Sequence, residues 1–398
     1  MKTLRHHSLA ATLLFSFTVH ADQIGNQARE IAHRYPLIDG HIDVPYRLQE
    51  KWDDVTEATA TGDFDYPRAK AGGLSAPFMS IYTPASSEAK GATALADILI
   101  DQVEAIVYRA PDKFAVARTS SDIRSQFKAG KISLLLGMEN GAPIAGDLKN
   151  LKHFYDRGVR YITLTHALSN HIADSSYDKA RLWQGLSQFG VTLVAAMNRL
   201  GVMIDIAHVS DDAFYQVLKV SKVPVIASHS SLRHFTPGME RNVDDDMLKA
   251  LAKNGGVILI NFGSYFVTEA AHQYSDVQKL AEDGFKKLHN DKPTDEATKG
   301  FEQAYKERFP YPFAKLSDVA DHIDHAVKLV GVEHVGFGSD FDGVGDSLPT
   351  DLKDVSHYPN LIAELLRRGY KEADIAKIMS GNVLRVMEAV EKYAAGQK

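Results

Sequence analysis

Short apolar runs alternate along the chain with longer segments in which apolar residues recur at helical spacing. The short runs are typical of buried β-strands, and the longer segments are typical of amphipathic helices. Strands separated by helices in this way pair in parallel, because each helix returns the chain to the same end of the sheet. The predicted strands cover residues 37–44, 75–82, 132–139, 160–166, 202–208, 224–229, 257–262 and 334–340. The predicted helices cover residues 93–109, 120–129, 148–158, 184–200, 211–220, 244–253, 317–330, 359–368 and 371–391.

Eight strands are the number that closes a parallel sheet into a (β/α)8 barrel of the TIM type, which is an α/β fold. A doubly wound open sheet is the structural alternative, but it usually carries a glycine-rich phosphate loop, and we find none in the sequence. Residues 265–316 break the alternation because they are charged and lack strong apolar runs. We therefore expect residues 22–398 to form a single barrel domain, with a helical insertion between the seventh and eighth strands.

The first 21 residues are predicted to be a signal peptide. Lys2 and Arg5 precede an apolar run over residues 9–19, and Val19-His20-Ala21 has small residues at the positions that a signal peptidase reads. A membrane anchor is the alternative, but the run has only about half of the ~20 residues that a spanning helix needs. We therefore expect an exported protein, periplasmic or secreted, that has no stable membrane anchor.

Composition narrows the kinds of partner and of metal site. The 398 residues are 44% hydrophobic and 24% charged, which is ordinary for a globular enzyme. The formal net charge is -6, and loss of Lys2 and Arg5 with the leader makes it -8, so nucleic acid is not an expected partner. The chain has no cysteine, which excludes disulfides and thiolate ligands. Any metal must therefore be held by histidine, aspartate and glutamate.

Histidine and carboxylate side chains stand at the ends of most predicted strands. The carboxyl ends of the strands of a βα barrel meet at one mouth, so these side chains are expected to converge. Each has an ordinary explanation by itself, such as a hydrogen-bonded core histidine, but their coincidence favours a metal site. Strand alternation also predicts that His208 and His229 share a face with the apolar residues of their own strands. The residues are His41, Asp43, Glu139, His166, His208, His229 and Asp340.

Nitrogen and oxygen ligands without thiolates suit Zn²⁺ or a similar borderline ion. Five or six ligands exceed one four-coordinate site, whereas two ions that share a bridging carboxylate, roughly 3.5 to 4 Å apart, would use them all. Glu139 is the best candidate for the bridge, because its strand lies between that of His41 and Asp43 and those of His208 and His229.

Seven short motifs extend these strand ends: Leu-Ile-Asp-Gly-His41-Ile-Asp43, Gly-Met-Glu139, Tyr-Ile-Thr-Leu-Thr-His166, Asp-Ile-Ala-His208-Val-Ser, Ala-Ser-His229-Ser-Ser, Arg241-Asn242-Val and Gly-Ser-Asp340-Phe-Asp-Gly. Together they resemble the membrane (renal) dipeptidase family of zinc metallopeptidases, in the family's order and over about residues 34–387. The resemblance implies a bacterial exported dipeptidase with two Zn²⁺ ions per chain. His41 and Asp43 would hold one ion, His208 and His229 the other, and Glu139 would bridge them.

The resemblance also implies that His166 lies near the scissile carbonyl and that Arg241 meets the C-terminal carboxylate of a dipeptide. The family often accepts a D-residue at the C-terminal side, which extends the expected substrates. A hydroxide held between two Zn²⁺ ions is available near neutral pH, and Asp340 can carry its proton to the leaving amine. Without the resemblance, we would interpret Arg241 as one partner of a surface salt bridge. Glu139 is followed by Asn140, where well-known relatives carry glycine.

Two other functions compete with this hypothesis. Another binuclear barrel hydrolase, acting on cyclic amides, lactones or phosphoesters, often bridges its metals through a carboxylated lysine, but no lysine stands at a strand end here. An exported binding protein with a structural metal would not explain why Asp340, His166 and Arg241 accompany a full ligand set. Asp39 and Asp205 either orient the ligand histidines or are buried carboxylates without a metal role. The number of chains in the assembly stays open, a homodimer included.

Overall fold

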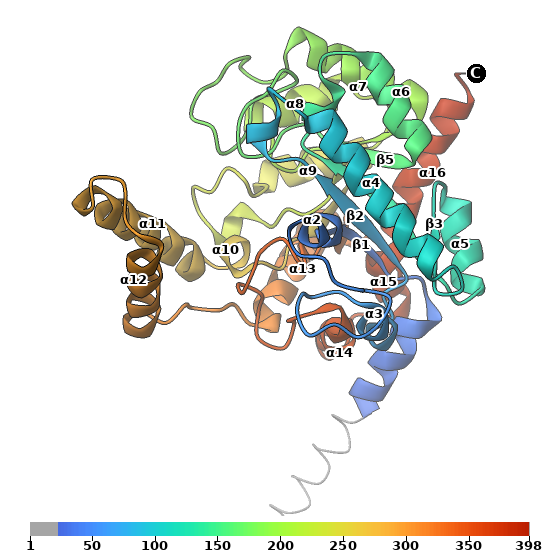
Figure 1. Ribbon diagram of the computed structural model, residues 1–398. Helices are drawn as coiled ribbons and strands as arrows, with labels where there is room; N and C mark the ends of the chain where they lie inside the picture. The colour runs from blue at the N-terminus through green and yellow to red at the C-terminus, as the bar shows by residue number, and fades with distance from the viewer. Residues whose placement is uncertain (1–22, 398) are drawn as a thin grey trace, which may run out of the picture.

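A closed ring of eight parallel strands forms the centre of the computed structural model, which describes residues 23–397 (Figure 1). The strands are β1 (Ile38–Ile42), β2 (Ala76–Tyr82), β3 (Phe114–Val116), β4 (Ile132–Glu139), β5 (Val159–Thr163), β6 (Met203–Asp205), β7 (Ile226–Ala227), β8 (Val257–Ile260) and β9 (Val335–Phe337). Eight of these strands form the ring, and β3 lies outside it. Around the ring the order is β2-β1-β9-β8-β7-β6-β5-β4, and the pairing of β2 with β4 closes it. The predicted TIM-type barrel is confirmed.

Helices connect the strands and pack around the ring (Figure 1). A helix over residues 23–34 precedes β1. The other α-helices are α2 (Val44–Glu50), α3 (Tyr66–Gly72), α4 (Ala92–Arg109), α5 (Ser120–Lys128), α6 (Leu148–Arg157), α7 (Gln188–Leu200), α8 (Asp211–Val220), α9 (Asp245–Asn254), α10 (Ser264–Val267), α11 (Glu269–Leu288), α12 (Asp295–Arg308), α13 (Leu316–Val330), α14 (Tyr358–Arg367), α15 (Glu372–Ala376) and α16 (Asn382–Ala395). Short 3₁₀ turns are η1 (Ala85–Ser87), η2 (Ala142–Ile144), η3 (Arg233–Phe235), η4 (Val332–His334) and η5 (Val355–His357), and a π-helical turn, Lys377–Gly381, joins α15 to α16.

Several elements were not predicted from the sequence, among them the helix over residues 23–34, strand β3 and helices α2 and α3. Strand β3 pairs only with the first residues of β4 and lies outside the ring, and three residues are too few for a periodic pattern. Helix α2 begins directly after β1, with Asp43 at its N-cap and Pro45 in its first turn. Helix α3 begins where the Asp65 side chain accepts a hydrogen bond from the Arg68 backbone N–H, and it ends at Gly73 with φ +77°. Local capping defines α3, whereas α2 has no side-chain cap and only the proline in its first turn favours a helix start there.

Several strands end earlier than the apolar runs suggest. Strand β6 ends at Asp205 and β7 at Ala227, so His208 and His229 lie in the loops beyond them. The Asp205 carboxylate accepts hydrogen bonds from the backbone N–H groups of Ala207 and Ser228. These bonds turn the segments after β6 and β7 away from the backbone hydrogen bonds of the sheet. The prediction that these histidines share a face with the apolar residues of their strands is therefore wrong, because strand alternation stops before it reaches them.

One apolar cluster fills the barrel from the amino-terminal ends of its strands. Ile38 and Val257, at the starts of β1 and β8, belong to this cluster together with Phe78 and Leu135. Val383 and further apolar residues of α16 join them, so this helix covers that end of the barrel. The side chains of the cavity described below lie at the opposite end, where the strands have their carboxyl ends.

Helices α11 and α12 form the predicted insertion and project from the barrel as an antiparallel pair (orange-brown in Figure 1). The rings of Phe285 and Phe301 stack between them with centroids 4.6 Å apart. The Tyr274 hydroxyl donates a hydrogen bond to the Phe309 carbonyl oxygen at 2.9 Å, which brings the two ends of the pair together. All 14 residues of α12 are at least partly exposed.

The predicted signal peptide lies outside the described residues. Among the residues that are described, none of the helices combines the length and the apolar character that crossing a membrane requires.

Candidate active site

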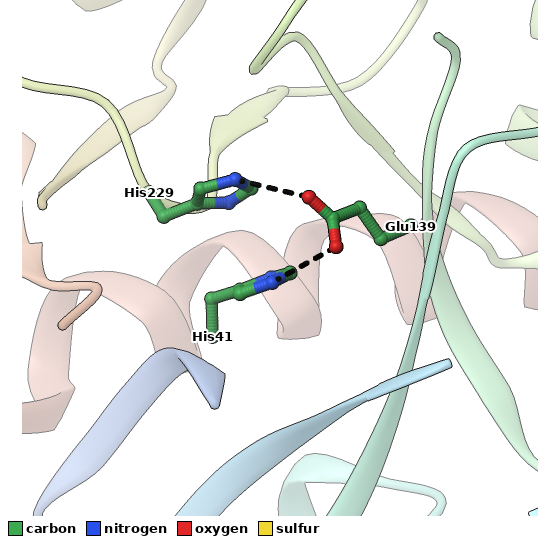
Figure 2. A group of neighbouring side chains, drawn as sticks. All are labelled: His41, Glu139 and His229. Atoms are coloured by element: carbon green, nitrogen blue, oxygen red, sulfur yellow. Dashed lines mark ion pairs between the residues drawn. The ribbon is translucent and has the colours of Figure 1, made fainter. Parts of the chain in front are cut away.

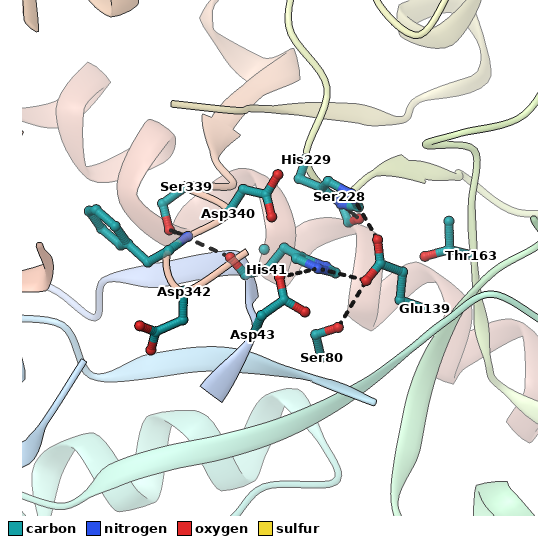
Figure 3. A network of polar contacts seen from close by, with 12 residues as sticks. His41, Asp43, Ser80, Glu139, Thr163, Ser228, His229, Ser339, Asp340 and Asp342 are labelled. Carbon is teal, nitrogen blue, oxygen red and sulfur yellow. Dashed lines mark hydrogen bonds and ion pairs between the residues drawn. The ribbon is translucent and has the colours of Figure 1, made fainter. Parts of the chain in front are cut away.

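A cavity of about 710 Å³ opens at the carboxyl ends of the strands. Asp43, Glu139, His166, His208 and Asp340 line it, together with side chains from α2, α10 and α11. His41 and His229 lie beside these residues and are buried. The seven side chains predicted at the strand ends therefore meet in one place. Figure 3 shows His41, Asp43, Glu139, His229 and Asp340 of this set.

Glu139, the last residue of β4, is the centre of this group. Its Oε2 atom lies 3.3 Å from Nε2 of His41, and its Oε1 atom lies 3.4 Å from Nε2 of His229, as Figure 2 shows. The same Oε1 atom lies 3.2 Å from Nε2 of His208 and 3.5 Å from Nε2 of His166. Although burial opposes its ionisation, the surrounding histidines hold the pKa of Glu139 well below its usual range. Each oxygen of one carboxylate thus faces different imidazole nitrogens.

The hydrogen bonds of Tyr161 determine which nitrogen of His41 is free. The Tyr161 hydroxyl donates to the Gly40 carbonyl oxygen at 3.0 Å and lies 2.8 Å from Nδ1 of His41. Because its single proton goes to Gly40, the hydroxyl accepts from Nδ1–H, so Nε2 is the nitrogen whose lone pair a cation can bind. Among the described residues, this buried Nε2 atom finds no hydrogen-bond partner, although carboxylate oxygens surround it. An imidazole lone pair that faces carboxylates fits a bound cation.

Ser228 and Asp205 orient His229 in the same way. The Ser228 hydroxyl donates to the Asp205 carboxylate at 2.6 Å and lies 2.7 Å from Nδ1 of His229. Nδ1–H of His229 therefore donates to Ser228, and Nε2 again carries the lone pair toward Glu139. Asp205 also accepts a hydrogen bond from the Thr163 hydroxyl. Asp205 acts on the site through Ser228, which answers one of the two questions that the sequence left open.

Asp39, the second buried carboxylate whose role the sequence did not decide, contacts backbone groups rather than the side chains of the predicted ligands. It accepts hydrogen bonds from the backbone N–H of His41 at 2.8 Å and of Ser339 at 3.1 Å, and from the Tyr358 hydroxyl. It therefore ties the end of β1 to the loop after β9, which carries Asp340.

Burial lowers the pKa of both His208 and His229 well below the usual range, so both imidazoles are neutral near pH 7. Their Nε2 atoms are only 2.8 Å apart. At His41 burial also disfavours charge, but Tyr161, Glu139 and Asp43 outweigh it and raise the pKa well above its usual range, so its Nε2 holds a proton that a bound cation would displace. The site thus combines neutral nitrogen ligands with carboxylates that favour a nearby positive charge, which is the donor set that a divalent ion needs.

Potential ligand atoms within 4.8 Å of one another fall into three overlapping groups around Glu139 and His41. They are His41, Glu139 and His229; Glu139, His166 and His208; and His41, Asp43 and Asp340. Because Glu139 belongs to two groups and His41 to two, the residues extend over more space than one ion occupies.

Asp340 lies at the mouth, on the loop after β9, with a left-handed backbone (φ +64°). Burial and the Asp43 carboxylate raise its pKa to about 7, and its Oδ2 atom accepts a hydrogen bond from the Asn261 side chain at 2.7 Å. A Cβ atom on Gly343 would lie 2.2 Å from Asp43 Oδ2 and 2.4 Å from Asp340 Oδ1. Only glycine leaves room for both carboxylates at this point of the loop.

Arg241 is close to the predicted ligands but lies behind them. It is 4% exposed, and its guanidinium donates to the Ser230 hydroxyl at 2.7 Å and to the His229 carbonyl oxygen at 2.7 Å. A third contact, at 3.1 Å, joins it to Nε2 of His208. Lys279, from the insertion helix α11, lines the cavity where Arg241 does not. A direct contact between Arg241 and substrate therefore stays a prediction.

Two further residues near Glu139 show how the loops are built. Asn140 has φ +72° and His208 has φ +66°, in the left-handed region that favours glycine. Asparagine tolerates this conformation better than most residues, so Asn140 can adopt it without glycine. Its side chain also donates to the Thr83 carbonyl oxygen at 2.9 Å.

Sequence reasoning missed Tyr161, Ser228 and Asn261, which hold the site residues in place. Tyr161 contacts a residue 120 positions away, and Asn261 contacts one 79 positions away. No local pattern could have identified either contact. Ser228 directly precedes His229, and this adjacency was the only available signal.

Comparison with known proteins places the chain among metallopeptidases. A sequence profile of the membrane dipeptidase family, peptidase family M19, matches residues 25–398. Dipeptidase verJ of Clonostachys rogersoniana is 34% identical over 388 residues, which cover 94% of this chain and 89% of that protein.

Two solved structures resemble the barrel closely. The probable dipeptidase PvdM from Pseudomonas aeruginosa has a TM-score of 0.81 and 28% identity, with 94% of this chain and 100% of that chain covered. A metallopeptidase from Rhodobacter sphaeroides, liganded with a phosphinate mimic of the dipeptide L-Ala-D-Ala, has a TM-score of 0.73 and 26% identity, with 89% and 99% covered.

Proposed function

The chain belongs to the membrane dipeptidase family, and from this premise we propose that it is a binuclear zinc dipeptidase that hydrolyses free dipeptides. The observation that carries the proposal is the position of Glu139. Its two oxygens face Nε2 atoms from β1 on one side and from the loops after β6 and β7 on the other. One carboxylate between two sets of nitrogen ligands is the arrangement that a bridged pair of ions requires.

In this proposal His41 and Asp43 hold one ion, His208 and His229 hold the other, and Glu139 bridges them. When bound, the ions would activate a water molecule and polarise the scissile carbonyl. Tyr161 and Ser228 keep the lone pairs of their histidines directed into the site. The protein's own contribution at this level is the orientation of ligands before any ion binds.

Asp340 is the proposed proton carrier. Its pKa of about 7 suits a group that accepts a proton from the attacking water and returns it to the leaving amine near neutral pH. His166 is the proposed contact to the scissile carbonyl oxygen. Its Nε2 lies 3.5 Å from Glu139, and its ring packs edge-on against Tyr82 with centroids 4.7 Å apart. These contacts support a fixed position for the ring at the cavity wall.

The proposed substrates are dipeptides, including those with a D-residue at the C-terminal side. The phosphinate mimic of L-Ala-D-Ala bound by the Rhodobacter sphaeroides metallopeptidase supports this extension. Arg241 is proposed to read the C-terminal carboxylate, which requires its guanidinium to exchange one of its present contacts for the substrate. We further propose that residues 1–21 are removed on export and that the mature domain acts in the periplasm or outside the cell.

A panel of substrates tests the proposal. The purified protein would be incubated with L,L- and L,D-dipeptides, with their C-terminal amides and with a lactone, before and after chelation and zinc addition. We expect chelator-sensitive release of amino acids from dipeptides and much slower turnover of the amides. Turnover of the lactone without any dipeptide hydrolysis would replace the proposal by the rival barrel hydrolase. Equal turnover of the amides would remove Arg241 from its proposed role.

A further inference from the structure

A second group of potential metal ligands lies outside the cavity. His234 in η3, Asp245 at the start of α9 and His325 in α13 place one ligand atom each within 4.8 Å of one another. His234 is exposed and the other two are partly buried. None of the three lines the cavity at the strand ends. The group therefore needs an explanation that is separate from peptide hydrolysis.

The three side chains of the group are in close contact. Nε2 of His325 lies 2.8 Å from an Asp245 oxygen. The rings of His234 and His325 stack with centroids 4.2 Å apart and an interplanar angle of 22°. A neutral imidazole ring offers one lone pair to a cation, so the two rings can supply two nitrogen ligands beside the Asp245 carboxylate.

The backbone that carries these side chains is firmly held. Phe235, next to His234, packs on His322 with ring centroids 4.3 Å apart, and His322 lies on the same helix as His325. Asp211 accepts two hydrogen bonds from the Arg233 guanidinium, at 2.8 and 2.6 Å, on the other side of His234. On this backbone the three ligand atoms already lie within 4.8 Å of one another.

We propose that His234, Asp245 and His325 form a peripheral site for a borderline divalent cation such as Zn²⁺. Two imidazole nitrogens and one carboxylate oxygen suit zinc, and exposure of His234 leaves the remaining coordination positions to water. Binding at Nε2 of His325 requires its ring proton to move to Nδ1 or to solvent, so the site fills less readily as the pH falls. A bound ion would link η3 and the start of α9 to α13, in which His325 lies 80 positions after Asp245.

Zinc stoichiometry tests this site on the full chain. The protein and its His234→Ala and Asp245→Asn variants would be dialysed against the same buffered Zn²⁺, and bound metal per chain would be measured by mass spectrometry. His153→Ala is the control, because His153 also pairs with a carboxylate, Asp97 at 2.9 Å, yet belongs to none of the potential ligand groups among the described residues.

We expect both variants to bind one Zn²⁺ fewer than the unaltered protein, and the control to bind the same number. Dipeptide hydrolysis should be unchanged in the His234→Ala variant, which separates this site from the catalytic one. Equal stoichiometry in all four proteins would overturn the proposal. As a second readout, Co²⁺ should give a d–d absorption band that the His234→Ala variant reduces, and identical spectra would also contradict it.

Discussion

At the scale of single residues, the site depends on two hydroxyl groups, each of which donates its one proton to a fixed acceptor and therefore accepts from a ligand histidine. The Tyr161 hydroxyl has one proton and gives it to Gly40, so His41 must place its own ring proton on Nδ1. The Ser228 hydroxyl gives its proton to Asp205, with the same result for His229. The ligand types were predictable from the strand ends, but the tautomers were not, because their causes lie on other strands.

Asp340→Asn tests the proposed proton carrier. The amide can still accept the hydrogen bond from Asn261, but it cannot take up a proton. We expect kcat for dipeptides to fall about 10²- to 10⁴-fold while the metal content stays the same. Asp346→Asn, an exposed carboxylate on the same loop, is the control and should be fully active. Loss of metal from the Asp340→Asn protein would mean that Asp340 is a ligand instead.

Ser228→Ala tests the orientation of His229. Without the hydroxyl, Nδ1–H loses its acceptor and Asp205 loses a donor, so the ring is free to change tautomer. We expect the affinity for zinc at the site to fall about 10- to 100-fold, measured by competition with a chelator. Ser87→Ala is the control, since among residues 23–397 the Ser87 hydroxyl bonds only to the nearby Pro84 carbonyl oxygen. Unchanged affinity in Ser228→Ala would show that His229 does not depend on Ser228 for its orientation.

At the scale of elements, the sequence predicted the helices and strands of the barrel better than their ends. Helix α8 has the predicted bounds, because Ser210 caps it and its apolar residues keep one face. Helix α7 begins at Gln188, four residues later than predicted, because Ser187 accepts from the Gly190 backbone N–H and so marks the N-cap. The ends of the strands depend on hydrogen bonds that Asp39 and Asp205 accept from distant backbone N–H groups. The pattern of apolar residues does not predict such bonds.

His322 joins three elements and should make their packing dependent on pH. Nδ1 accepts a hydrogen bond from the Leu232 backbone N–H at 3.0 Å, and Nε2–H donates to the Val267 carbonyl oxygen at 2.9 Å. Burial lowers the pKa of His322 to about 4, below the value of about 6.5 in the unfolded chain. Because the folded pKa is the lower one, its stabilising effect is complete above pH 6.5 and is lost as the pH falls toward 4.

The measurement is urea unfolding of the protein and of His322→Asn, whose side-chain oxygen can accept from Leu232 without titrating. Between pH 7 and pH 4 the unaltered protein should lose about 3 kcal/mol more unfolding free energy than the variant. His153→Asn, at an exposed position, should lose as much as the unaltered protein. Parallel losses in the unaltered protein and His322→Asn would rule out His322 as the cause.

At the scale of the whole molecule, eight alternating units were enough to predict the closed barrel, since closure follows from strand number and crossover direction. The path of the insertion was not predictable in the same way. Its helices bury few residues, so their sequence records little about where they lie. That α11 brings Lys279 to the cavity wall could only be learned from the structure.

Removal of the insertion tests how far the barrel depends on it. Because Tyr274 and Phe309 are hydrogen-bonded, residues 276–307 can be replaced by a short glycine-serine linker. We expect the thermal midpoint to change by only a few degrees and KM for dipeptides to rise, since one wall of the cavity is lost. Lys279→Ala in the intact chain separates the loss of this side chain from the loss of the wall. An unfolded deletion protein would show instead that the insertion is part of the barrel's core.

The most direct test of a binuclear dipeptidase is a zinc titration of the metal-free protein, with amino-acid release from a dipeptide followed at each step. The His234→Ala variant is the appropriate background, because it removes the proposed peripheral site. We expect activity to rise until two Zn²⁺ ions are bound per chain and then to level off, with no activity in the metal-free protein. Full activity without zinc, or a plateau at one ion per chain, would contradict a centre bridged by Glu139.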